Sequence, residues 1–277
     1  MTYKTIAVWL DRRRSAPADA AILIAQTFEA HLTALNHIDS TRLPPYIRAH
    51  LGEEIARQQM RVAETAAEDR GRGFEAIARR EGLGSVEVRK LAGDPVTGLA
   101  ISARYADLLV LGQPDPEKLD SPDDRDFADR TVLAAGRPTL LIPYAGSFPV
   151  IGTHAVVAWS ATRESARAVA DALPLLKRAK RVTVIVGDAK PSFNGHGQTP
   201  GADIALYLAR QGVKVEVSQE QTAGLDVGSL LLSRISDLGA DLLVMGAYGH
   251  SRVRELVLGG VTRTILREMT VPVLMSH

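Results

Sequence analysis

The sequence predicts an α/β protein built from two tandem domains, each a parallel five-stranded sheet with helices on both faces. Short, uniformly apolar segments alternate with longer segments rich in Ala, Leu and Arg, a pattern typical of buried parallel strands connected by helices. The chain also repeats itself: residues 106–112 (ADLLVLG) recur at 240–246 (ADLLVMG), an offset of 134 (246 minus 112). Pro138 and Pro272 share that offset. A repeat of this length indicates that a whole domain was duplicated.

The expected strands are short apolar segments bounded by Gly, Pro or charged residues. They fall at residues 4–10, 31–38, 86–91, 107–112 and 139–142 in the first half, and at 154–159, 181–187, 213–218, 241–246 and 272–275 in the second. Helices are expected between them, including residues 96–104, 163–179 and 228–238. Asp94 and Pro95 stand where the N-cap and the first residue of a helix belong.

The two halves differ in the length of their middle part. Residues 5–11 open the first half and residues 154–160 open the second, an offset of 149 (154 minus 5) where the later elements have 134. The extra residues therefore fall around 39–82, in a charged segment with apolar residues at helical spacing. The expected domains, separated by a short Gly/Ser/Pro link, are residues 1–146 and 149–277.

Composition excludes several classes of function. Lys plus Arg (33) nearly balances Asp plus Glu (32), so there is no overall charge to attract nucleic acid or an anionic membrane. The chain has no cysteine, which rules out disulfides, thiolate metal sites and thiol catalysis. No apolar stretch is long enough to span a bilayer and no leader segment is evident. We therefore expect a cytoplasmic protein with neither a membrane nor a nucleic acid as partner.

The most informative motif follows the fourth expected strand of the second half. Gly246 and Gly249 come first, and Gly259 and Gly260 follow ten residues later. Glycines let the chain turn sharply and approach a ligand closely, and the amides at a helix start can hold phosphate. The G-x2-G-x9-G spacing, with Val-Pro-Val-Leu-Met at 271–275, resembles the ATP-binding signature of the universal stress protein family.

This resemblance implies two tandem flavodoxin-like (Rossmann-like) domains with a nucleotide site in the second. Met245 and Gly246 would lie near the ribose and adenine, Gly249 and His250 near the phosphates, and residues 259–261 would present amides to the phosphates. The implied site residues are Ala158, Trp159, Ser160, Gly187, Met245, Gly246, Gly249, His250, Gly259, Gly260 and Val261.

The second half departs from the family pattern at two positions. Where the family usually has Asp at the adenine end, this chain has Ser160, and where ATP-binding relatives have Ser or Thr, it has Gly260. A hydrogen bond to a charged group contributes roughly 1.5–3 kcal/mol, so the two changes together are expected to weaken a micromolar site towards the millimolar range.

The first half lacks the glycine motif. Asp11 is present, but after Gly112 the chain reads QPDPEKLDSPDDRD up to residue 126. The prolines remove amide donors and the acidic residues repel phosphate, so we expect no nucleotide in this half. These acids could instead hold a divalent cation, although a solvated loop is favoured because the run lacks the spacing of a calcium loop. In the second half, residues 192–201 are a plain loop or a lid near the site.

The favoured hypothesis is an adenine-nucleotide-binding or -sensing stress-response protein without a defined reaction, with ATP, with or without Mg²⁺, as ligand. No hydrolase, kinase or P-loop motif occurs, so no catalytic residue and no metal ligand is assigned. The alternatives are a scaffold that binds no nucleotide and acts through protein contacts and, less favoured, a slow ATPase. By the resemblance, the fused halves pair as an internal pseudo-dimer, and a further homodimer is left open.

Overall fold

Over the residues that it describes, the computed structural model contains ten strands and the helices between them. It describes residues 2–11, 15–38, 53–117, 125–187, 199–222, 224, 226–249 and 260–277. The strands are β1 (Thr5–Trp9), β2 (His31–His37), β3 (Val86–Leu91), β4 (Leu108–Gly112), β5 (Thr139–Ile142), β6 (His154–Ala158), β7 (Arg181–Gly187), β8 (Val215–Glu220), β9 (Leu242–Gly246) and β10 (Val273–Ser276). The helices are α1 (Ala16–Phe28), α3 (Glu53–Arg80), α4 (Pro95–Ala103), α6 (Phe127–Ala135), α7 (Arg163–Leu176), α8 (Ala202–Arg210), α9 (Val227–Leu238) and α11 (Val261–Glu268).

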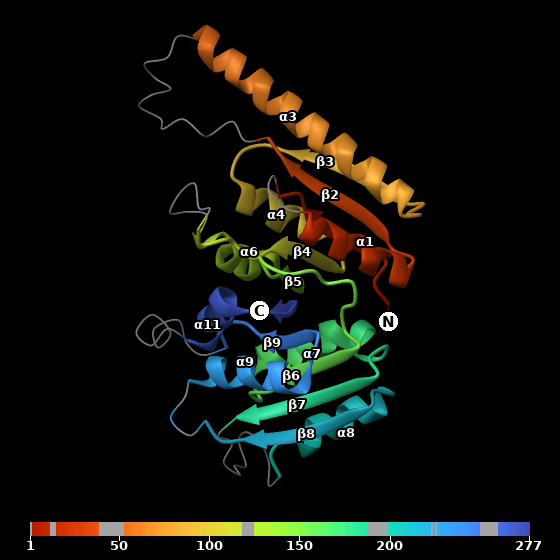
Figure 1. The fold of residues 1–277 in the computed structure, drawn as a ribbon, viewed down its shortest axis with the longest axis vertical. Coiled ribbons are helices and arrows are strands. Elements are labelled where there is room, and N and C mark those ends of the chain that lie inside the picture. The colour runs from red at the N-terminus through yellow and green to blue at the C-terminus, as the bar shows by residue number, and fades with distance from the viewer. Residues whose placement is uncertain are drawn as a thin grey trace.

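All the strands lie in one sheet, in the order β3-β2-β1-β4-β5-β10-β9-β6-β7-β8 (Figure 1). Within each half the neighbouring strands are parallel. Counted from the outer edge, each half has the strand order 3-2-1-4-5, which is the Rossmann order and places a switch point beside its first strand. The predicted α/β fold with a parallel five-stranded sheet in each half is confirmed.

Helices cover both faces of the sheet because successive strand residues are apolar on both sides. Val8 packs into one cluster with residues of α1, α3, α7 and α8, and its neighbour Ala7 packs into another with residues of α4, α6, α9 and α11. We call these the α1/α7 face and the α6/α11 face. Strands buried on both faces explain why the sequence shows continuous apolar runs instead of alternation.

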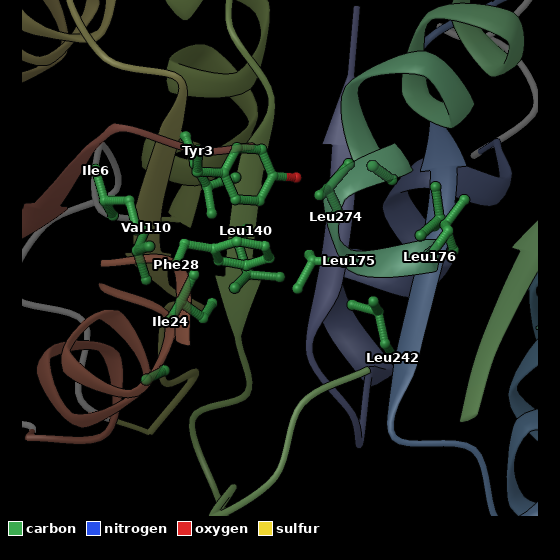
Figure 2. Packing of buried hydrophobic residues seen from close by; sticks show 14 of the residues in the cluster. Tyr3, Ile6, Ile24, Phe28, Val110, Leu140, Leu175, Leu176, Leu242 and Leu274 are labelled. Carbon is green, nitrogen blue, oxygen red and sulfur yellow. The ribbon is translucent and has the colours of Figure 1, made fainter. Parts of the chain in front are cut away.

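The two halves join edge to edge through an antiparallel pair, β5 with β10. Leu140 lies opposite Leu274 in this pair, and both are fully buried. Figure 2 shows the packing around the join, where the Tyr3 ring reaches across from the first half. The Tyr3 hydroxyl donates a hydrogen bond to the carbonyl oxygen of Asp171 in α7 at 2.8 Å. Burial raises the pKa of that hydroxyl, with the nearby carboxylates adding to the rise.

The aspartate of the repeated Ala-Asp-Leu-Leu-Val motif has the same structural role in both halves. The Asp107 carboxylate accepts hydrogen bonds from the amides of Lys4 and Thr5 at the start of β1. The Asp241 carboxylate accepts from the amides of Gly152, Thr153 and His154 at the start of β6. The aspartate of the motif therefore holds the start of the first strand of each half and has a structural role, not a ligand-binding one.

The extra residues of the first half form most of α3. This helix has 28 residues, whereas α8, at the same position in the second half, has nine. In Figure 1 its first turns lie beyond the ends of β2 and β3. The predicted helix starting after Asp94 is also present, and the Asp94 carboxylate accepts from the Thr97 amide at 2.8 Å, as expected for an N-cap.

Across the described ranges, no helix is both long and apolar enough to cross a membrane.

Candidate functional site

The topological switch point of the second half, where the strand order reverses direction, lies at the carboxyl ends of β6 and β9. These strands are neighbours, but the chain continues from them towards opposite sides of the sheet. Ala158 pairs in register with Met245, and residues 246–249, which we call the glycine turn, continue from the end of β9. Ligands of parallel α/β sheets bind outside strand ends of this kind. Two of the predicted site segments, residues 158–160 and 245–249, therefore meet at one place.

Gly246 is required by the close approach of α7 to the end of β9. A Cβ atom at this position would lie 2.5 Å from the Ser165 amide nitrogen and 2.6 Å from the Glu164 carbonyl carbon. At Gly249 a Cβ atom would lie 3.1 Å from both a Glu164 carboxylate oxygen and the Thr162 hydroxyl. Helix packing alone thus accounts for glycine at 246, whatever ligand is bound.

The glycine turn is linked to the start of α11. The Tyr248 amide donates to the Thr262 hydroxyl at 3.3 Å, and Tyr248 has a left-handed backbone with φ of 56°. Gly260 is the N-cap of α11, and it has no side chain with which to cap the N-terminus of this helix. The first-turn amides of α11 and its dipole therefore face the switch point without a cap from the N-cap side chain. Such an end can accept an anion.

The predicted site residues at the end of β6 lie on different faces of the sheet. Ala158 packs on the α6/α11 face, whereas Trp159 packs on the α1/α7 face. Ser160 is exposed, and its hydroxyl lies 3.2 Å from that of Thr162, the N-cap of α7. The structure therefore brings Ala158 together with the α11 side of the switch point and directs Trp159 to the opposite face.

Glu164 is a buried carboxylate beneath the glycine turn, which sequence reasoning missed. Its side chain is 4% exposed and pairs with the exposed guanidinium of Arg163. Burial on its own would raise the pKa of Glu164, but the hydrogen bonds and charge of Arg163, with the Glu164 amide and the Thr162 hydroxyl, hold it below its usual value. A negative charge thus already lies beside the place where phosphates were predicted.

An aromatic cluster fills the equivalent place in the first half. The Trp9 ring lies between those of His37 and Phe127, with centroid distances of 5.7 Å and 5.4 Å. The His37 Nε2 atom is 2.9 Å from the carbonyl oxygen of Gly93. These side chains come from the ends of β1 and β2 and from the start of α6, the elements that surround this switch point.

The second half has small residues at all three corresponding positions. Trp9 and His37 end the first and second strands of their half, and Phe127 opens the helix that precedes the fifth strand. The residues at the same places in the second half are Ala158, Gly187 and Val261. A Cβ atom at Gly187 would meet nothing closer than Val227 at 3.9 Å, so the packing does not demand glycine there.

Some predicted residues fall outside the described ranges. They are His250 and Gly259 of the site, residues 118–124 of the acidic run after Gly112, and residues 192–198 of the suggested lid. In the described part of that acidic run, Asp115 is buried and its carboxylate accepts from the Glu117 amide at 3.1 Å. Across the described residues, no group of three or more His, Cys, Asp or Glu side chains is placed to hold a metal ion.

Comparison with known proteins bears on the second half of the chain and on the fold. Residues 153–277 match the model of the universal stress protein family. The second half of the chain, residues 153–277, is thus assigned to the universal stress protein family. A universal stress protein of Synechocystis is 55% identical over 67 residues, which make up 24% of this chain and 22% of that relative. The match thus spans less than a quarter of the relative's length.

Two solved structures share the fold over nearly the whole of this chain. One is a universal stress protein from Archaeoglobus fulgidus, with a TM-score of 0.71, 16% identity and coverage of 98% of this chain and 95% of its own. The other is a protein of unknown function from Pseudomonas aeruginosa, with a TM-score of 0.60, 18% identity and coverage of 99% and 92%. At these identities the likeness concerns the fold.

Proposed function

We propose that this universal stress protein binds an adenine nucleotide, ATP first, at the switch point of its second half, as a sensor without a defined reaction. The observation that carries the proposal is the contrast between the halves. Three rings fill the switch point of the first half, and Ala158, Gly187 and Val261 stand in their places in the second. A planar base needs the volume that such small side chains leave.

The proposed roles follow from the positions of these residues. The base would lie against Ala158, Gly187 and Val261, with Met245 and Gly246 beside the ribose. The phosphates would lie between the glycine turn and the first turn of α11, where the uncapped helix end favours negative charge. His250 and Gly259 belong to the proposed site by the family signature, and Ser160 would lie at its rim, whereas Trp159 packs on the opposite face and is given no contact.

Isothermal titration of the intact chain with ATP, ADP and cyclic AMP tests the proposal. We expect ATP to bind with a Kd between about 10 µM and 1 mM, because the Ser160 and Gly260 changes remove side-chain contacts and leave amide donors. Absence of heat with millimolar ATP would exclude the nucleotide site. Mass spectrometry of the gently denatured protein as purified checks for a nucleotide already bound, and phosphate release from ATP with Mg²⁺ would favour the slow ATPase.

Glu164 favours the second candidate, a scaffold without nucleotide. Its buried carboxylate lies beneath Gly249 and repels an incoming phosphate, while the exposed Arg163 offsets only part of that charge. In this alternative the Glu164 carboxylate, and no phosphate, supplies the negative charge that the helix dipole stabilises at the start of α7.

Glu164→Gln separates the two candidates. If phosphates bind beside the glycine turn, the variant should bind ATP roughly 3–10-fold more tightly, because a like charge a few ångströms away has been removed. The gain should be smaller for ADP and absent for adenosine. Titration of all three ligands measures it.

The matched control for this experiment is Glu87→Gln, which removes an Arg-paired carboxylate in the first half. It should leave every affinity unchanged. Equal affinities of the Glu164→Gln variant and the original chain for ATP would place the phosphates elsewhere.

We also propose that residues 1–146 and 149–277 are two domains that pair as the subunits of a dimer would. The antiparallel β5/β10 pair and the matching strand orders support this arrangement. In it, the first domain contributes no ligand site of its own.

A further inference from the structure

Gln113, from the first half, holds the far end of α11. It follows β4 directly, and its side chain is buried. Its Nε2 atom donates to the carbonyl oxygens of Leu266 and Arg267 at 2.9 Å and 3.0 Å, and its Oε1 atom accepts from the Tyr144 amide at 3.0 Å. The last carbonyls of a helix have no partner within the helix. The first half thus supplies the cap of the helix whose other end faces the switch point.

Asp129, also from the first half, reaches the glycine turn. Its carboxylate is hydrogen-bonded to the Tyr248 side chain, and it lies close enough to Arg263 of α11 and to Asp126 for their charges to act on it. Burial raises the pKa of Asp129, and the hydrogen bond from Tyr248 opposes that rise. Asp129 and Arg263 are each the third residue of their helix, so their charges act between equivalent positions of the two halves.

Tyr248 is an unusual residue to find in the glycine turn. Its φ of 56° lies in the left-handed region, which a bulky residue adopts only when its surroundings hold it there. Its amide is bonded to Thr262, and its ring lies edge-on to that of His277. The hydroxyl contact with Asp129 adds a support from outside the second half.

We propose that the first half is the positioning element of the site in the second half, acting through Asp129 on Tyr248 and through Gln113 on α11. The purpose of this role rests on the proposed nucleotide function, whereas the contacts themselves do not depend on it. A ligand that binds a turn and a helix end already held in place loses less free energy in ordering them.

Hydrogen exchange of the ligand-free full chain tests the positioning directly. Asp129→Ala and Tyr248→Phe should each raise exchange of the amides at 246–249 and 260–263 about tenfold, because each removes the same hydrogen bond. Asp129→Asn keeps an acceptor for the Tyr248 hydroxyl and should stay within about twofold of the original chain. Tyr3→Phe removes a different bond between the halves and should leave these amides unchanged.

Titration with ATP supplies a second, separate readout. Asp129→Ala and Tyr248→Phe should weaken ATP binding about tenfold, and Asp129→Asn should restore it. If the amides at 246–249 and 260–263 exchange at the original rate in Asp129→Ala and Tyr248→Phe, the positioning role is wrong. It is also wrong if Tyr3→Phe raises their exchange equally, or if the original chain binds ATP and these two variants bind it with the same affinity. If the original chain binds no ATP, the proposed function fails, and the exchange data alone decide the positioning role.

Discussion

Ala158→Trp should reduce the affinity for ATP by at least about 30-fold while leaving the fold intact. The indole would occupy the place of the base at the end of β6, as the Trp9 ring occupies the equivalent place at the end of β1. Since the first half accommodates a tryptophan there, the same residue should be tolerated in the second. Blocking a base pocket removes most of the apolar contact of a nucleotide, which amounts to roughly 2 kcal/mol or more. Isothermal titration measures the affinity, and circular dichroism checks the fold.

Ala209→Trp is the control for introducing an indole. Ala209 is exposed in α8, so this variant should bind ATP like the original chain. Undiminished binding by a folded Ala158→Trp variant would show that the base lies outside this switch point, and the contrast between the halves would then have another cause.

Gly246→Ala should lower the free energy of unfolding by about 2–4 kcal/mol and the Tm by roughly 5–10 °C. The added methyl would lie 2.5 Å from the Ser165 amide nitrogen and 2.6 Å from the Glu164 carbonyl carbon, both backbone atoms of α7. Rotation of a side chain cannot relieve this overlap, so α7 or β9 must move. Thermal unfolding followed by circular dichroism measures the loss.

Gly187→Ala is the matched control, because it adds the same methyl at the end of a strand in the same half. That methyl would lie 3.9 Å from Val227, an ordinary contact, so the Tm should change by less than about 2 °C. An equal loss in both variants would show that strand-end glycines matter for another reason. A stability loss confined to Gly246→Ala also means that failure of this variant to bind ATP would not identify Gly246 as a nucleotide contact.

Much of the fold could be predicted because its causes are local. Apolar runs such as Leu108–Gly112 and Leu242–Gly246 can be buried only as central strands, and the repeat fixes their equivalence. The antiparallel join of β5 to β10 could not be derived from residues alone, since either fifth strand could also pair with a second copy of the chain. Only the family resemblance indicated that the fused halves would pair with each other.

The site was harder to predict, because its properties depend on distant parts of the chain. The family signature places Gly246 beside the ribose and adenine, but its neighbours Glu164 and Ser165 show that helix packing also requires glycine there. The aromatic cluster could have been found by aligning strand ends, since Trp9 and Ala158 occupy matching places. The reach of Gln113 to α11 spans 153 residues and has no sequence signal.

The join between β5 and β10 also decides how the protein avoids aggregation. Both strands are fully buried and carry almost only apolar side chains, so either one exposed as a sheet edge would recruit other chains. The strands that end the sheet in the described residues, β3 and β8, carry charged side chains such as Glu87, Arg89 and Glu216. Covalent linkage keeps the two apolar edges at a high effective concentration for each other. A half produced alone would lose that protection and present one of these edges to water.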